Sequence, residues 1–140
     1  MAILLDTVAL SELRKKSKAD RAVLAWQTEQ GGELAYVSVM TMNEIRYGAK
    51  KVTLRDPGFG ARLRIWYGEI LAAPSLYSIL PIHLGIAEQA ADFRAVLGLP
   101  YNDSFIAATA HTHDLTLATR NISDFEKTGI RLVNPWDFGK

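Results

Sequence analysis

Short apolar runs alternate with longer amphipathic segments along the chain. The runs at 3–5, 34–39, 77–82, 115–119 and 130–133 are rich in aliphatic or β-branched residues and are short enough to be buried strands. Between them, apolar residues recur at steps of three and four. This spacing predicts helices at about 11–30, with a break near Ser17, and at 41–50, 59–73, 83–97 and 102–113.

Turn residues separate these segments. Gly31-Gly32 is expected to stop the first helical stretch, Arg55–Gly60 reads "RDPGFG" and predicts a turn, and Gly98 is expected to close the helix before it. Strands that are apolar throughout, and that alternate with helices, indicate an α/β fold with a mostly parallel sheet covered on both faces.

Four acidic residues occur where predicted strands end or predicted helices begin. Asp6 follows the first strand, and Asp124 follows the fourth. Glu44 lies in the first turn of the helix after the second strand, and Asp103 opens the helix "NDSFIAATA". Ligand sites of open α/β sheets gather outside the carboxyl ends of the strands, so we expect these acids on one rim of the sheet.

Each acid also has an ordinary structural explanation. Thr41-x-x-Glu44 fits a helix capping box, and Asn102 is a candidate cap for the helix that contains Asp103. The other two acids fit turn positions. Together, however, four carboxylates on one rim repel one another unless a cation lies among them, and Mg²⁺ prefers oxygen ligands. We therefore expect one or two divalent ions at this rim, which suits phosphoryl chemistry.

Composition limits the other possibilities. The chain has 140 residues, the size of one domain, and has no cysteine, which excludes disulfides, thiolate metal sites and cysteine nucleophiles. We expect no membrane span and no signal peptide, and a cytoplasmic location is compatible with this composition. A net charge of +1 is weak evidence about nucleic acid. The basic cluster Arg14–Lys18 fits a solvated helix end or a phosphate-facing patch.

Five segments, in this order and spacing, resemble the PIN-domain ribonucleases, and among them the VapC-type toxins of toxin–antitoxin pairs. The segments are "LLDT" at Leu4–Thr7, "SVMTMNEIRYG" at Ser38–Gly48, "NDSFIAATA" at Asn102–Ala110, "LATRNISDF" at Leu117–Phe125 and "LVNPW" at Leu132–Trp136. The resemblance implies a three-layer α/β/α sandwich around a five-stranded, mostly parallel sheet, with residues 1–140 forming a single PIN domain.

The resemblance also implies an activity. It implies an endoribonuclease that depends on Mg²⁺ or Mn²⁺, cuts structured RNA such as tRNA, is silenced by a small cognate antitoxin and forms a homodimer. Carried over by position, the metal-binding and catalytic acids are Asp6, Glu44, Asp103 and Asp124, and the supporting polar pair is Thr119 and Asn121.

Two positions depart from the family pattern. Val8 stands where relatives often have a polar residue after Asp-Thr, which removes one possible partner of Asp6. Asn121 stands where many relatives carry an acid, so the fourth acidic role falls to Asp124. Two alternatives stay open: a nuclease of the same fold that acts on DNA, and a catalytically inert module that only binds a partner.

Several other residues are candidates for a functional role. His111 and His113 lie two positions apart, which points their rings about 200° apart on a helix and argues against a shared metal ion. Arg46 and Arg120 flank the acids and are equally consistent with phosphate binding or with solvated surface positions. The helical face of Phe59, Trp66 and Ile70 favours a core or dimer surface over base stacking.

Overall fold

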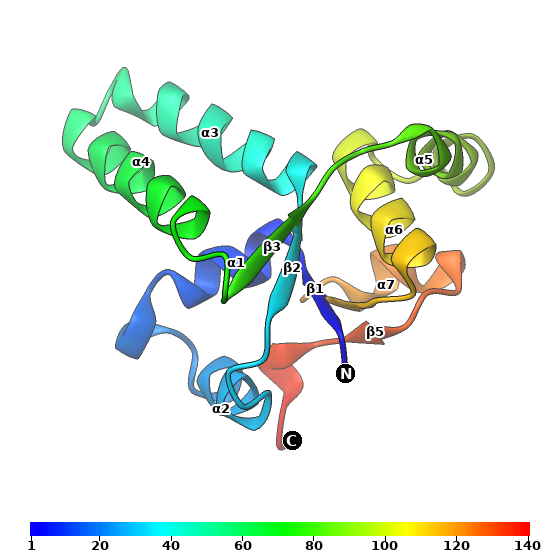
Figure 1. The fold of residues 1–140 in the computed structure, drawn as a ribbon, viewed down its shortest axis with the longest axis horizontal. Helices are drawn as coiled ribbons and strands as arrows, with labels where there is room; N and C mark the ends of the chain where they lie inside the picture. Colours follow the sequence, from blue (N-terminus) through cyan, green and yellow to red (C-terminus); the bar gives the residue numbers. More distant parts are fainter.

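The computed structural model describes all of residues 1–140 and is built around a five-stranded sheet (Figure 1). All neighbouring strands are parallel, in the order β3-β2-β1-β4-β5. The predicted α/β architecture is therefore confirmed, and the sheet is parallel throughout. The strands are β1 (Ile3–Leu5), β2 (Ala35–Ser38), β3 (Tyr77–Leu80), β4 (Thr116–Ala118) and β5 (Leu132–Val133).

Helices cover both faces of this sheet. One face carries α1 to α4, and the other carries α5 to α7 (Figure 1). The helices are α1 (Thr7–Leu13), α2 (Arg21–Glu29), α3 (Val39–Thr53), α4 (Pro57–Leu71), α5 (Leu84–Leu97), α6 (Tyr101–His113) and α7 (Ile122–Phe125), with 3-10 turns at Lys16–Lys18, Glu126–Thr128 and Pro135–Asp137.

Alternation along β1 divides the apolar core into two layers. Ile3 and Leu5 pack with residues of α1 to α4, whereas Leu4 packs with residues of α5 and α6. Successive side chains of a strand point to opposite faces, so this three-residue strand contributes to both layers. A central strand held from both sides is a rigid support for whatever follows it in the sequence.

The first helix begins earlier than the hydrophobic spacing predicts. α1 starts at Thr7, directly after β1, because the Asp6 side chain accepts a hydrogen bond of 2.8 Å from the backbone N–H of Ala9 and caps the helix. The predicted start near Ser11 is therefore wrong. The predicted break near Ser17 is confirmed by a 3-10 turn between α1 and α2.

The segment "RDPGFG" is mostly helical, which corrects the predicted turn. Asp56 accepts a hydrogen bond of 3.0 Å from the N–H of Phe59, and Pro57 occupies the first position of α4, where a missing N–H costs nothing. A Cβ atom at Gly60 would collide with the hydroxyl oxygen of Thr53. Only glycine therefore permits α3 and α4 to approach this closely.

No helix of the structure combines the length and apolar character needed to span a membrane. The features that matter for function lie where β1, β2 and β4 end. Each of these strands leads at its carboxyl end into a helix start or a tight turn, and α6 contacts β2, β4 and α3.

Candidate active site

Asp6 is the most deeply buried acid of the site. Its side chain is held by the α1 cap, its backbone N–H donates to Ala118 O at 3.1 Å, and the residue is only 6% exposed. Burial raises the pKa of Asp6, and the charge of Asp103 raises it further. Hydrogen bonds from the Ala9 N–H and the Thr119 side chain act in the opposite direction and lower this pKa.

Glu44 projects from α3 toward Asp6 and does not cap its own helix. Ser38 is the cap residue of α3, and its hydroxyl accepts from the N–H of Met40 at 3.1 Å, so the predicted capping box is wrong. Instead, Glu44 Oε1 accepts a hydrogen bond of 2.9 Å from the Thr7 hydroxyl. The acid thus bonds across the structure to the residue after Asp6, and it remains available at the rim.

The pKa of Glu44 is also raised. Burial is the main cause, and the charges of Asp103 and Asp6 add to it. Hydrogen bonds from the Thr7 hydroxyl and the Asn102 side chain lower the pKa in part. Glu44 is therefore electrostatically connected to two other acids and held by two neutral donors.

Asp103 lies in the first turn of α6, as predicted, although its helix is capped differently. Pro100 occupies the cap position and α6 begins at Tyr101, so Asn102 is inside the helix and the prediction that it caps is wrong. Burial raises the pKa of Asp103, and the charge of Asp124 raises it further. Asp124 itself is exposed and lies in the short helix α7 rather than in a turn.

We call these four residues, Asp6, Glu44, Asp103 and Asp124, the acidic rim. Their charges act on one another in a connected chain: Asp6 with Asp103, Glu44 with both, and Asp103 with Asp124. The structure therefore brings together all four acids that the sequence analysis selected. They come from the end of β1 and from α3, α6 and α7, which are far apart in the sequence.

No basic side chain neutralises the acidic rim. The three ion pairs of the structure join Met1 with Glu33, Lys15 with Glu12, and Arg131 with Asp114. Arg46 and Arg120 are exposed and lie over the rings of Tyr67 and Trp136, at 5.9 and 5.1 Å from the ring centroids.

The donor chemistry of the acidic rim fits a hard divalent cation. Carboxylates without a basic partner, three of them with raised pKa values, gain most from a nearby positive charge, and oxygen atoms are the ligands that Mg²⁺ prefers. The acids are neighbours but are not arranged as a closed coordination shell, since the structure contains no group of three or more His, Asp or Glu side chains poised to hold a metal ion.

The polar pair predicted beside the acids divides into two different roles. Thr119 is fully buried directly after β4, where its side chain lies close enough to Asp6 to lower the pKa of that acid and its Oγ1 accepts from the N–H of Asn121 at 3.1 Å. Asn121 is exposed, and its side chain makes no hydrogen bond within the protein. Thr119 thus positions Asp6, while Asn121 only donates its backbone N–H to Thr119.

Three further polar residues belong to this site and were missed by sequence reasoning. Thr7 donates to Glu44, the Asn102 side chain lies close enough to lower the pKa of the same carboxylate, and the Thr41 hydroxyl lies 3.1 Å from that of Thr7. Thr7 and Asn102 each adjoin a selected acid in the sequence. This adjacency is the only local signal of their roles.

The remaining candidates lie apart from the acidic rim. The His113 ring packs edge-on to His83, with centroids 6.2 Å apart, and His111 packs edge-on to Phe93, so the two rings face different partners. In the basic cluster, Arg14 lies over the half-buried rings of Phe59 and Trp66. Residues 16–18 are exposed, which fits both a solvated helix end and a phosphate-facing patch.

Comparisons with known proteins agree with this architecture. The family model described as "PIN domain" matches residues 3–130. The chain is 40% identical to VapC ribonuclease Y4jK of Sinorhizobium fredii, over 96% of this chain and 98% of that protein. It is 32% identical to Toxin FitB of Neisseria gonorrhoeae, over 96% and 98%. It also resembles the toxin-antitoxin complex from Klebsiella pneumoniae, with a TM-score of 0.67, 29% identity and coverage of 98% and 100%.

Proposed function

Because the chain belongs to the PIN domain family, we propose that it is a metal-dependent endoribonuclease that acts as the toxin of a toxin–antitoxin pair. The observation that carries this proposal is the acidic rim, which collects four carboxylates from distant segments without a basic partner. The names of two relatives, a VapC ribonuclease and a toxin, support the same activity and biological role.

The acids of the rim are proposed to hold Mg²⁺ or Mn²⁺. Asp6 and Asp103 would be the principal ligands, with Glu44 and Asp124 completing the donor set. A divalent ion bound there lowers the pKa of a coordinated water and neutralises charge on the attacked phosphate. Asp6 suits this role because its carboxylate is fixed by the α1 cap and by Thr119, so little freedom remains to be lost on binding.

Glu44 is proposed to orient the attacking water and to accept its proton. Its Oε1 accepts a hydrogen bond from the neutral Thr7 hydroxyl, so no basic group competes for the proton. Burial raises the pKa of Glu44, which makes the carboxylate a stronger base than an exposed glutamate. Thr7 and Asn102 hold the carboxylate in one orientation and limit that rise.

The partners follow from the same proposal. The substrate is RNA, with structured RNA such as tRNA as the expected target, and cleavage would take place in the cytoplasm. A small cognate antitoxin would silence the enzyme, and similarity to a toxin-antitoxin complex supports this expectation. The homodimer remains a prediction of the family resemblance.

The test compares two aspartates at the two ends of the same helix. Wild type, Asp103→Asn and Asp114→Asn are assayed on total RNA with Mg²⁺ or Mn²⁺, with EDTA, and on single-stranded DNA. Asp114 ends α6 at the far side, in a left-handed conformation that asparagine tolerates, so its variant is a matched control.

We expect metal-dependent RNA cleavage by wild type and by Asp114→Asn, and a loss of about 10²-fold or more in Asp103→Asn. Preferential cleavage of DNA would favour the alternative nuclease. Absence of cleavage on either nucleic acid, with intact fold, would favour the inert partner-binding module. Activity that persists in EDTA or in Asp103→Asn would overturn the proposed site.

A further inference from the structure

A cavity of about 400 Å³ opens next to the acidic rim. It is lined by Asn43, Glu44 and Tyr47 of α3 and by Asn102 of α6. Glu44 belongs to both the cavity and the rim, so the two are continuous. The cavity walls combine two amides, one carboxylate and one aromatic ring, a set that can both hydrogen-bond and stack.

Tyr47 is the unusual member of this set because it is 63% exposed. It follows Glu44 by three residues, which is a rise of about 4.5 Å along α3 and places both on one side of the helix. Its hydroxyl makes no hydrogen bond within the protein. One face of its ring lies beneath the Lys51 ammonium, and the exposed ring stands at the edge of the cavity, where it can stack on a ligand.

Lys51 supplies a positive charge beside this ring. Its Nζ lies 5.5 Å from the centroid of Tyr47, and it belongs to none of the three ion pairs. Along α3, a carboxylate, an aromatic ring and a free ammonium group therefore follow one another over roughly 10 Å. An aromatic ring and a cation are the groups that bind a base and the backbone of a single strand.

We propose that this cavity binds an unpaired nucleobase of the RNA beside the scissile phosphate. Tyr47 stacks on the base, the amides of Asn43 and Asn102 hydrogen-bond its edge, and Lys51 contacts the adjacent phosphate. Asn102 and Glu44 line the same cavity, so a base bound there lies directly beside the carboxylate of the acidic rim. This inference rests on the proposed ribonuclease function and specifies that the cleaved strand is unpaired at this position.

A second tyrosine provides a matched control. Tyr101 is 56% exposed and also lies beneath a cation, with the Arg94 guanidinium carbon 4.7 Å from its ring centroid. Its ring packs edge-on to Phe105 at 5.0 Å, and it does not line the cavity. Removing either ring deletes a similar exposed surface, but only Tyr47 is expected to affect RNA.

The experiment measures KM and kcat on a short single-stranded RNA for wild type, Tyr47→Ala, Tyr47→Phe and Tyr101→Ala. Stacking of one base corresponds to about 1–3 kcal/mol, so Tyr47→Ala should raise KM roughly 5- to 100-fold with kcat little changed. Tyr101→Ala lies outside the cavity and should match wild type, whereas Tyr47→Phe keeps the ring face and should have a KM below that of Tyr47→Ala. An abasic RNA competitor should inhibit wild type and Tyr47→Ala equally, because it has no base to stack.

Four other results would overturn the nucleobase site. If wild type cleaves RNA but Tyr47→Ala keeps its KM, the nucleobase site is wrong and the ribonuclease function stands. A Tyr47→Phe variant as weak as Tyr47→Ala would overturn stacking. A change in oligomeric state on gel filtration, confined to Tyr47→Ala, would identify Tyr47 as a contact between copies of the chain instead. No metal-dependent cleavage by wild type would overturn the function and this inference together.

Discussion

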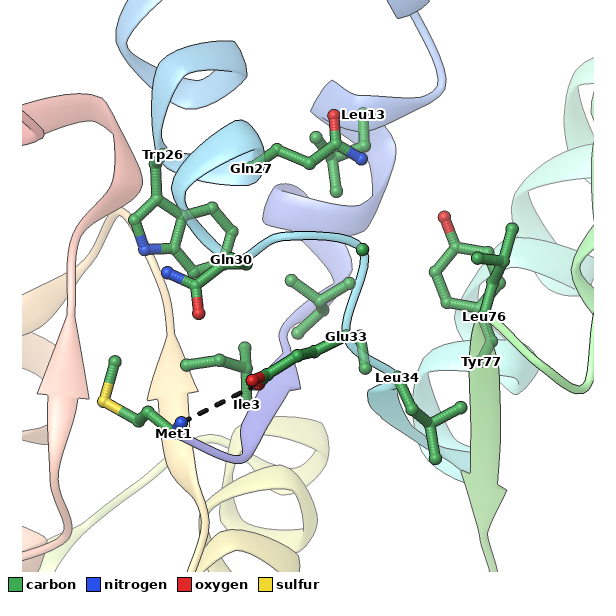
Figure 2. A pocket seen from close by; sticks show the side chains of 13 residues that line it. Met1, Ile3, Leu13, Trp26, Gln27, Gln30, Glu33, Leu34, Leu76 and Tyr77 are labelled. Atoms are coloured by element: carbon green, nitrogen blue, oxygen red, sulfur yellow. Dashed lines mark ion pairs between the residues drawn. The ribbon is translucent and has the colours of Figure 1, made fainter.

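The two ends of the parallel sheet differ in polarity. At the carboxyl end lies the acidic rim. At the amino end lies a cavity of about 110 Å³ with mainly apolar walls, which include Ile3, Trp26, Leu34 and Tyr77 (Figure 2). The charged groups there are at the edge of the cavity and are paired: the Met1 ammonium lies 3.7 Å from Glu33, and both are exposed. We call this region the apolar end.

β1 connects the two regions and shows what distinguishes them. Ile3 packs into the apolar core at one end, and Asp6, three residues later, is equally buried at the other end but among carboxylates. Burying a charge without a partner destabilises a fold, whereas burying isoleucine stabilises it. The acidic rim is therefore maintained at a cost in stability, as is common where a fold is shaped for function.

The largest stability effect is expected at the apolar end. Ile3→Ala enlarges an existing cavity and removes buried methyl groups, so it should lower the free energy of unfolding by about 2–5 kcal/mol. RNA cleavage per folded molecule should be unchanged well below the melting temperature. Urea denaturation and single-turnover cleavage measure the two properties separately. A loss of activity without a loss of stability would show that the two ends are not independent.

At the acidic rim, removal of a charge should stabilise the fold, in contrast to the substitution at the apolar end. Asp103→Asn relieves repulsion and the burial of a charge, so in the metal-free chain at neutral pH it should raise the free energy of unfolding by about 0.5–2 kcal/mol. Asp114→Asn, with an exposed carboxylate, should change it little. Thermal denaturation in EDTA measures this. A destabilised Asp103→Asn variant would contradict the repulsion described above.

The stability of the metal-free chain should fall with rising pH over a defined range. Burial and like charges raise the pKa of Asp103, so the folded chain binds more protons than the unfolded chain at pH values between the ordinary aspartate pKa of about 4 and the raised folded value. The stability of the metal-free wild type should fall as pH rises through this window, and that slope should be smaller in Asp103→Asn. An identical slope in the two proteins would assign the effect to other groups.

A smaller effect is expected from the hydrogen bond that holds Glu44. Thr7→Val removes the donor to Glu44 Oε1, at an expected loss of about 1 kcal/mol in stability. Because Thr7 lowers the pKa of Glu44, its removal should raise that pKa and shift the acid limb of the pH–rate profile to higher pH. Thr28→Val is the control, since Thr28 donates only to Leu24 O of its own helix. A limb that stays in place would exclude Glu44 as the proton acceptor.

The smallest effect is expected for the charge at the apolar end. Glu33→Gln breaks the ion pair with the Met1 ammonium, but both groups are exposed, so stability should change by less than about 0.5 kcal/mol. Chemical denaturation can measure this change. A loss above about 1 kcal/mol, more than an exposed ion pair supplies, would show that charge matters at both ends of the sheet.

Much of the fold could be predicted because its strands and most helices are locally encoded. The run Ile3–Leu5 is apolar on both faces, and this pattern indicates a central parallel strand with Asp6 at its end. The acidic rim could be predicted for the same reason, since strand ends of a parallel sheet meet on one side. The starts of the helices were predicted less well. The segment "RDPGFG" is typical of both a turn and a helix that begins with proline, and only the packing of α4 on α3 decides between them.

The hydrogen bonds within the site could not be predicted in this way. Thr41-x-x-Glu44 has the spacing of a capping box, yet Ser38 caps the helix and Glu44 bonds to Thr7, 37 residues earlier in the chain. A local pattern cannot reveal a competing partner that the fold supplies. The same applies to Asn102, whose amide contacts Glu44 only because α6 begins beside α3.

The most direct test of the acidic rim is its affinity for a metal ion, measured without RNA. Titration of the metal-free chain with Mn²⁺, followed by calorimetry or by the spin resonance of free Mn²⁺, should show saturable binding to wild type and to Asp114→Asn. Affinity should fall at least about tenfold in Asp6→Asn and in Asp103→Asn. Equal affinity in all four proteins, or no binding to wild type, would contradict the claim that these carboxylates form a cation site.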